Sequence, residues 1–259
     1  MTIRDVANYL EEIAPLEQAE DFDNVGLLIG NYTTKITGVL VTLDTLEETI
    51  DEAITRKCNL IVSFHPIIFS GLKKINGDSY VERVVLKAIQ NNIAIYASHT
   101  ALDNSNVGVS AKMCEVLGLK NYKTLIPKDN STTGMGMIGE LPAQMNEQDF
   151  LSYTKKVFKS DVIRHSSGLG KTIKKIAVLG GSGSFAISNA IQENADAYIS
   201  ADFKYHDFFK AEAKILLIDV GHYESEQFTK NLLVEYLTKK FTSFAVVLSE
   251  KSTNPIYYL

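Results

Sequence analysis

The sequence has little cysteine and lacks any apolar run long enough to cross a membrane. Cys58 and Cys114 are the only cysteines among 259 residues, which excludes the disulfide framework that holds many secreted domains together. A membrane-spanning helix needs about 20 apolar residues in succession, and the N-terminal stretch MTIRDVANYLEEIAPLE (1–17) places acids inside its apolar pattern. It predicts an amphipathic helix and not a signal peptide. We therefore expect a cytoplasmic protein with no membrane partner and with reduced, packed thiols.

The sequence also lacks an excess of positive charge. Lys plus Arg number 26 against 31 Asp plus Glu, a net charge of −5, which argues against a strongly electrostatic nucleic-acid binder but leaves a local basic patch open. Thiolate-rich spacing is missing, which argues against a structural zinc finger. The glycine-rich stretch GGSGS (180–184) lacks a P-loop lysine and the full dinucleotide spacing. A tight turn between strand and helix and a phosphate cradle remain the alternatives there.

What the sequence does contain is a regular alternation of apolar strands and amphipathic helices. In the first half, two helical patterns separate three β-branched apolar runs. This strand–helix order predicts a parallel sheet with both faces covered. The strands are expected at 36–44, 59–65 and 93–99, and the helices at 45–57 and 79–92.

A polar stretch rich in turn-forming residues, NYKTLIPKDNSTTGM (121–135), predicts a seam between two halves. After this stretch the strand–helix pattern resumes. We expect an α/β protein of two similar lobes, with mostly parallel sheets covered by helices, at residues 1–125 and 126–259. The strands of the second lobe are expected at 174–181, 195–203, 214–222 and 244–250.

The two halves show weak mutual similarity. VLVTL (39–43) aligns with IAVLG (176–180), and a later strand in each half ends in histidine with an acid four residues further on. The two pairs are His99 with Asp103 and His222 with Glu226. An internal duplication and repeated β-α-β geometry both account for this pattern.

Three histidines, His65, His99 and His222, each end an apolar strand. The carboxyl ends of parallel strands are where open α/β sheets place their sites. On a helical turn, positions i and i+4 share a face, so a histidine and an acid at that spacing can bind one ion. Imidazole and carboxylate ligands suit Zn²⁺, Fe²⁺, Mn²⁺ or Co²⁺, at one or two ions per chain. A structural role is the alternative for any one of these histidines.

Six short motifs occur along the chain: DNVGLLIG (23–30), SFHPIIF (63–69), SHTALD (98–103), GMIGELP (136–142), ADFKYHD (201–207) and GHYESEQ (221–227). Together they resemble the GTP cyclohydrolase 1 type 2 homologue family, the NIF-three-like proteins. The resemblance runs through nearly the whole chain, and it implies two similar lobes with a two-metal site in the cleft between them and a homohexameric ring. The seam at 121–135 is too short to hold the extra domain that some members insert, so we expect the compact form.

The resemblance assigns ligands to the two metals. His65 and Asp103 would hold one metal, His222 the other, and Glu226 would bridge them. The family pattern has two adjacent histidines, whereas the first of these positions is Phe64 in this chain. Phenylalanine cannot coordinate, so we expect the second metal to bind more weakly or not at all, with water or a neighbour such as His99 in place of the lost ligand.

Three further residues are candidates for proton transfer. The resemblance places the segment with Asp202 and His206 near the cleft, where either side chain could act as an acid or base. His99 is the third candidate. A turn with a helix cap is the alternative for the segment around Asp202.

Two classes of function follow from this site. The first is a metal-dependent hydrolase that uses metal-activated water on a nucleotide or related heterocycle, since the family's label implies opening of the GTP ring with loss of formate. In a variant of this hydrolase hypothesis, the substrate is a phosphoester. The second is a non-enzymatic, ring-shaped metal-binding protein that docks or regulates a partner. Phe64 favours this second class, because a structural ion tolerates the loss of one ligand position.

Overall fold

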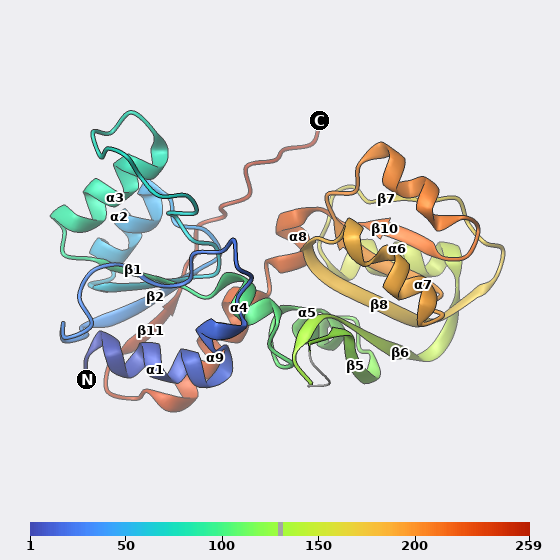
Figure 1. The fold of residues 1–259 in the computed structure, drawn as a ribbon, viewed down its shortest axis with the longest axis horizontal. Coiled ribbons are helices and arrows are strands. Elements are labelled where there is room, and N and C mark those ends of the chain that lie inside the picture. Colours follow the sequence, from blue (N-terminus) through green and yellow to red (C-terminus); the bar gives the residue numbers. More distant parts are fainter. Residues whose placement is uncertain (129–131) are drawn as a thin grey trace. The chain divides into compact units, whose positions relative to one another are not determined.

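The computed structural model describes residues 1–128 and 132–259, and the chain folds into two compact units (Figure 1). Unit 1 contains Met1–Leu102 and Thr229–Pro255, and unit 2 contains Asp103–Phe228 and Ile256–Leu259. This division differs from the expected lobes 1–125 and 126–259. The reason is strand β11 (Ala245–Leu248), which pairs in parallel with β2 (Gly38–Thr42) and so returns the end of the chain to the first sheet.

The sheet of unit 1 has the strand order β1-β4-β3-β2-β11. Strands β3 (Leu60–Ser63) and β4 (Ala94–Ala97) run parallel to β2, and β1 (Gly26–Ile29) pairs antiparallel with β4. The mostly parallel sheet that the sequence predicts is therefore present in this unit. Because β2, β3 and β4 are parallel neighbours, their carboxyl ends lie at one edge of the sheet.

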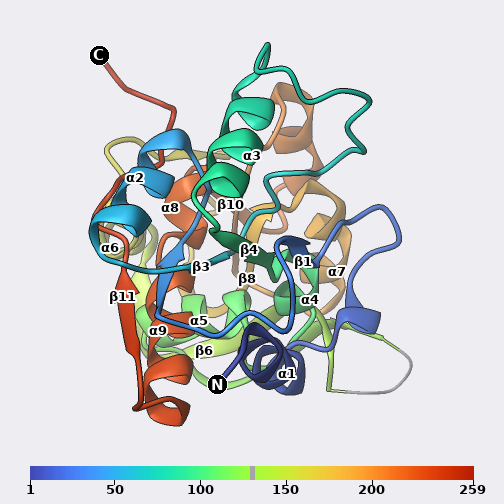
Figure 2. The ribbon, with the colours of Figure 1, turned by 90° about the vertical axis from the view of Figure 1, so that its left-hand side faces the viewer.

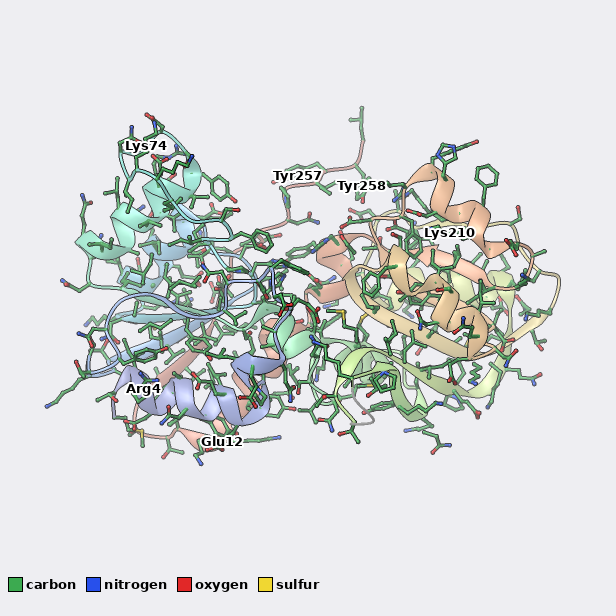
Figure 3. All side chains as sticks on the ribbon, in the orientation of Figure 1. Arg4, Glu12, Lys74, Lys210, Tyr257 and Tyr258 are labelled. Atoms are coloured by element: carbon green, nitrogen blue, oxygen red, sulfur yellow. The ribbon has the colours of Figure 1, made fainter. Side chains whose placement is uncertain are left out.

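Helices cover both faces of this sheet. Figures 1 and 2 show α2 (Glu47–Thr55) and α3 (Tyr80–Gln90) on one side, with α1 (Ile3–Ile13) and α9 (Thr229–Lys240) on the other. The predicted amphipathic character of the N-terminal helix is visible in Figure 3, where Arg4 and Glu12 project outward from α1. Its apolar stripe is buried, as the spacing requires, and consists of Ile3, Val6, Ala7 and Leu10.

The sheet of unit 2 has the order β5-β6-β8-β9-β10-β7 and is mixed. Its parallel part is formed by β8 (Thr172–Ser182), β9 (Ala197–Ala201) and β10 (Leu216–Asp219). The other pairings are antiparallel, which the expectation of mostly parallel sheets did not include. They involve β5 (Lys120–Pro127), β6 (Gly134–Asn146) and the short β7 (Arg164–His165).

The polar stretch 121–135 is not the seam that the sequence predicts. Most of its described residues belong to β5 and the start of β6, and residues 129–131 lie outside the described part of the chain. Strand β5 is at the edge of its sheet and its first residues are exposed. An edge strand with a solvated face tolerates polar residues, which is why its composition suggested a loop.

Alternating side chains of the unit 2 strands enter two separate apolar clusters. Ile176 and Val178 pack with α5 (Val109–Val116) and α6 (Glu147–Val157), whereas Ala177 and Leu179 pack with α7 (Ile187–Gln192). Successive residues of a strand point to opposite faces. Both faces of the central strands are therefore buried, as the continuous apolar runs indicate.

Short helical turns follow several strands and complete the fold. Two helices follow β10, α8 (His222–Glu226) and α9, and the segment after β9 forms a 3-10 helix. The remaining turns are η1 (Leu16–Gln18), α4 (His99–Asp103), η2 (Ser184–Ala186) and η3 (Tyr205–Ala211). Cys58 and Cys114 are buried free thiols, as expected.

No helix within residues 1–128 and 132–259 combines the length and the apolar character that crossing a membrane requires.

A buried carboxylate ties the C-terminal strand region to α2 within unit 1. Glu52 accepts hydrogen bonds from the Ser249 hydroxyl (2.6 Å) and the Glu250 amide (3.0 Å). We predict that Glu52→Ala lowers the free energy of unfolding by about 1–3 kcal/mol because it leaves these donors unpaired. Glu48→Ala, at an exposed position of the same helix, is the control. We expect it to change the free energy of unfolding by less than about 0.5 kcal/mol. Urea denaturation measures both, and equal values would contradict the role of Glu52.

Candidate metal centre

Polar side chains follow three neighbouring parallel strands of unit 1. Asp44 comes two residues after β2, His65 two residues after β3, and His99 two residues after β4. The backbone keeps these positions in register beyond the strands, because the His65 amide donates to the Leu43 carbonyl (2.9 Å) and the His99 amide to the Phe64 carbonyl (2.9 Å). The two imidazoles consequently lie side by side, with ring centroids 5.3 Å apart.

Each of these two histidines is held by an aspartate at Nδ1. His65 Nδ1 lies 2.8 Å from Asp44 Oδ1, and His99 Nδ1 lies 2.8 Å from Asp23 Oδ1. An ionised carboxylate can only accept, so Nδ1 carries the proton and donates it. Both pairs therefore leave Nε2 of the neutral ring as the nitrogen with a lone pair.

Further hydrogen bonds fix the two aspartates. Thr253 donates its hydroxyl to Asp44 Oδ2 (2.5 Å), and Thr100 donates both its amide (3.0 Å) and its hydroxyl to Asp23 Oδ2. Burial alone would raise the pKa of Asp23, but the hydrogen bonds from His99 and Thr100 outweigh it and lower the pKa from 3.8 to about 2. The carboxylate is thus strongly held in its charged form.

The carboxyl ends of three parallel strands of unit 2 carry a similar group. Asp202 follows β9 directly, and His222 and Glu226 begin and end α8 after β10. His222 Nδ1 donates to Asp202 Oδ2 (2.7 Å), and His222 Nε2 lies 3.2 Å from Glu226 Oε2. The predicted pairing of positions i and i+4 is therefore present. Ser182, the last residue of β8, donates its hydroxyl to the same Asp202 oxygen.

Local backbone geometry brings these side chains together. Asp202 has φ 58° and Gly221 φ 95°, the left-handed region that favours glycine and that aspartate tolerates better than most residues. Between them, the buried carboxylate of Asp219 accepts from the amides of Phe203 (3.0 Å) and Gly221 (3.0 Å) and pairs with Arg164. Asp219 thus holds the turn after β9 against the turn that precedes His222.

The charge around His222 favours a cation. Burial acts to lower the pKa of His222, but its hydrogen bonds with Asp202 and Glu226 prevail and raise the pKa to about 11. The pKa of Asp202 is lowered, chiefly by the hydrogen bond from His222. Two carboxylates therefore stabilise positive charge at this imidazole.

Glycine at position 181 allows Glu226 and His222 to approach the end of β8. A Cβ atom on Gly181 would lie 2.5 Å from Glu226 Oε1 and 3.4 Å from the His222 ring. The Gly181 amide donates to the Ser225 hydroxyl (2.9 Å), which fixes the middle of α8. The stretch GGSGS (180–184) is expected from the sequence to form either a tight turn or a phosphate cradle. These contacts favour the tight turn, because Gly181 leaves room for α8.

The predicted site residues have different surroundings. Asp202 contacts His222 directly, so it is an orienting residue, and its part in proton transfer stays a prediction. His206 lies exposed in η3 against Tyr205 (ring centroids 5.2 Å), and no hydrogen bond or ring contact joins it to His222 in the described chain. Asp103 is the last residue of α4 and the first residue of unit 2, and it is half-buried.

Phe64 is the position at which the family resemblance implies a histidine. Its side chain is fully buried, and its ring packs against those of His65 (4.9 Å between centroids) and His99 (5.6 Å). Phe64 therefore supports the two imidazoles of unit 1 through apolar packing and offers no ligand atom.

Sequence reasoning did not find Asp44, Asp23 and Ser182. Asp44 and Ser182 are at the ends of strands β2 and β8, so their position after an apolar run is a signal that could have found them. Asp23 carries no such signal, because it lies 76 residues before its partner His99.

The donor set fits a divalent transition metal. Metal-binding histidines almost always donate their other ring N–H to a carboxylate or carbonyl group, and His65, His99 and His222 each donate it from Nδ1 to an aspartate. Glu226 adds a buried carboxylate beside His222 Nε2. Neutral imidazole with carboxylate, in the absence of thiolate ligands, suits Zn²⁺, Fe²⁺, Mn²⁺ or Co²⁺.

Comparisons with known proteins identify the family. The sequence model of the family Duf34/NIF3 (NGG1p interacting factor 3) matches residues 1–255, and the chain belongs to this family. A GTP cyclohydrolase 1 type 2 homolog from Clostridium acetobutylicum is 33% identical over 232 residues, which cover 87% of this chain and 85% of the relative. The resemblance stated from the motifs is thereby confirmed.

A second relative and two solved structures extend the likeness over the whole chain. The homolog of the same name from Staphylococcus epidermidis is 28% identical over 366 positions that cover both chains completely, so it contains residues without a counterpart here. A Staphylococcus aureus hypothetical protein superposes with TM-score 0.92 at 30% identity, covering 100% of this chain and 99% of that one. A Bacillus cereus protein related to NIF3, with TM-score 0.91 at 24% identity and the same coverage, shows the fold. The mixed α/β architecture with two helix-covered sheets is confirmed.

The Asp23–His99 pair makes stability depend on pH. The folded pKa of Asp23 is about 2, below its ordinary 3.8, so the pair stabilises the fold above the ordinary pKa and loses this contribution as the pH falls toward 2. We predict that Asp23→Asn lowers the free energy of unfolding by about 2 kcal/mol at about pH 6 and by much less near pH 2. Urea denaturation across this range measures the difference, and a loss that does not change with pH would contradict the account.

Proposed function

We propose that this protein binds divalent metal ions through His65, Asp103, His222 and Glu226 and acts as a metal-dependent hydrolase on a nucleotide or related heterocycle. The observation that carries the proposal is the aspartate at Nδ1 of each strand-end histidine. These aspartates fix Nδ1 of His65 and His222 as the donating nitrogen, so a metal would bind at Nε2, where in His222 it would replace the proton shared with Glu226. His65 and Asp103 would hold one ion, and His222 the other, with Glu226 as a ligand to both. The second ion would bind more weakly, because Phe64 offers no ligand atom where the family resemblance implies a histidine.

A divalent ion at these ligands supplies a Lewis acid and a water of lowered pKa, about 7 in favourable zinc sites. The protein's own residues supply orientation and proton transfer. Asp202 and Asp44 fix the ring planes and tautomers of His222 and His65. His99, held in the same way by Asp23, can carry a proton at Nε2 and is our candidate general acid or base, while Asp202 and His206 are the other two candidates.

The substrate class is inferred from the relatives. Several of them are named GTP cyclohydrolase 1 type 2 homolog, a name that points to hydrolytic attack on a purine ring. A phosphoester is the variant substrate, since the same metal chemistry serves both. We also propose self-assembly of the chain into a ring, a hexamer, on the basis of the family resemblance.

A non-enzymatic role is the second candidate, and the burial of Phe64 favours it. A fully buried phenylalanine in the place of a ligand removes one coordination position, which a structural ion tolerates better than a pair of catalytic ions does. In that case the metal would stabilise a ring-shaped protein that docks a partner.

Metal content per chain tests the proposal. We predict at least one bound ion in the native protein after growth with ample metal, and a loss of bound metal in His222→Ala and in Glu226→Gln because each removes a ligand. His165→Ala is the matched control, since His165 is exposed and its Nδ1 pairs with the Ser166 carbonyl (2.8 Å). Elemental analysis measures all four proteins. Native protein without metal, or metal retained in both ligand variants, would contradict the site.

The same samples separate the enzyme from the scaffold. A hydrolase loses turnover of GTP in His222→Ala while its thermal stability changes little. A metal-stabilised scaffold instead loses thermal stability or assembly when a chelator removes the ion.

The substitution Gly181→Ala tests whether Glu226 is a metal ligand, and Gly170, which has the same φ, provides the control. Gly181 and Gly170 both have φ +66°, but a Cβ atom would meet Glu226 only at Gly181, and none of the described atoms lies within 4 Å of a Cβ at Gly170. We predict that Gly181→Ala weakens zinc binding by roughly tenfold or more because it displaces Glu226. Gly170→Ala, which introduces the same backbone strain, should leave zinc affinity unchanged. Competition with a chelating dye measures both, and equal affinities would show that Glu226 is not a ligand.

A further inference from the structure

A pocket of about 430 Å³ in unit 1 has His65 and its aspartate Asp44 in its wall. The volume lies in the range of small-molecule sites, about 300–1,000 Å³. We infer that this pocket binds the uncharged heterocyclic ring of the substrate and excludes phosphate groups. The inference rests on the proposed function, which places a metal on His65, and it chooses the heterocycle over the phosphoester as the group that lies beside that metal.

The walls of the pocket suit a flat ring. Leu46, Pro66, Ile67 and Pro255 supply apolar surface, and Tyr80 supplies an aromatic face. Tyr80 is the first residue of α3, 54% exposed, and no aromatic ring of the described residues packs against it. Nitrogen heterocycles stack on exposed aromatic side chains of this kind.

The charge of the pocket disfavours an anion. Asp44 is the carboxylate in its wall, and no lysine or arginine is among the lining residues. Glu47 and Glu48 add acids in the first turn of α2, and the basic residues nearby are paired, Arg83 with Glu47 (2.8 Å) and Lys87 with Asp51 (2.6 Å). A phosphate carries nearly two negative charges at neutral pH, so the carboxylates of the metal-free pocket would repel it.

A polar residue of the wall can recognise ring substituents. Thr45 lines the pocket, and its hydroxyl is buried without a hydrogen-bond partner among the described residues. A buried hydroxyl without a partner is rare in native proteins and calls for an explanation. Rotation of the Thr45 side chain toward the pocket would let a ring carbonyl or amine supply the missing partner.

The test measures binding of the purine nucleosides guanosine, inosine and adenosine, with inorganic phosphate as the charged probe. Isotope-labelled methyl groups of Leu46 and Ile67 report occupancy of the pocket by nuclear magnetic resonance, on full-length protein with and without metal. We expect at least one nucleoside to shift these signals in both forms, and phosphate to leave them unchanged in the metal-free form. Tyr80→Ala should weaken nucleoside binding roughly fivefold or more. Tyr205→Ala, at a 74% exposed tyrosine of unit 2, is the control and should not change it.

Failure of this inference differs from failure of the proposed function. The ring subsite is wrong, even when the protein holds its metal, if no nucleoside shifts the methyl signals or if phosphate shifts them in the metal-free form. It is also wrong if Tyr80→Ala binds nucleoside as well as Tyr205→Ala does. If a nucleoside binds and the native protein holds no metal, the subsite stands and the hydrolase proposal fails.

Discussion

The hydrogen bond between an aspartate carboxylate and the Nδ1 of a histidine is the interaction on which the candidate site depends. It occurs at His65, His99 and His222, with distances of 2.7–2.8 Å. Each such bond fixes the ring plane and the tautomer, so that Nε2 is the nitrogen left for a metal or a proton. Without the aspartates the rings would rotate freely and both tautomers would be populated. The chemistry proposed for the protein follows from this single constraint.

Both units produce this constraint by the same structural means. Three parallel strands end at one edge of a sheet, and the residues just beyond them carry the polar groups, as is usual in open α/β folds. In unit 1 these are Asp44, His65 and His99, and in unit 2 Ser182, Asp202 and His222. The apolar strands and covering helices of each unit hold this edge rigid. The weak sequence similarity between the halves therefore corresponds to similar strand arrangements, which duplication or repeated β-α-β geometry would both produce.

The sequence predicted the local features of this arrangement better than the distant ones. The strands that precede His65, His99 and His222 were found because buried parallel strands are continuous apolar runs, and the contact of His222 with Glu226 follows from helical spacing. Strand β5 was missed because an edge strand can be polar. The return of β11 to the first sheet and the pairing of Asp23 with His99 join residues far apart in the chain, and no local pattern encodes such contacts.

The most direct test of the central claim is which imidazole nitrogen binds the metal. Nuclear magnetic resonance of protein with isotopically labelled histidine nitrogens, loaded with cadmium in place of the native ion, reveals the nitrogen coupled to the metal. The account predicts scalar coupling to Nε2 of His65 and of His222, with Nδ1 of each ring still protonated. Coupling to Nδ1, or none at either histidine in metal-loaded protein, would contradict it.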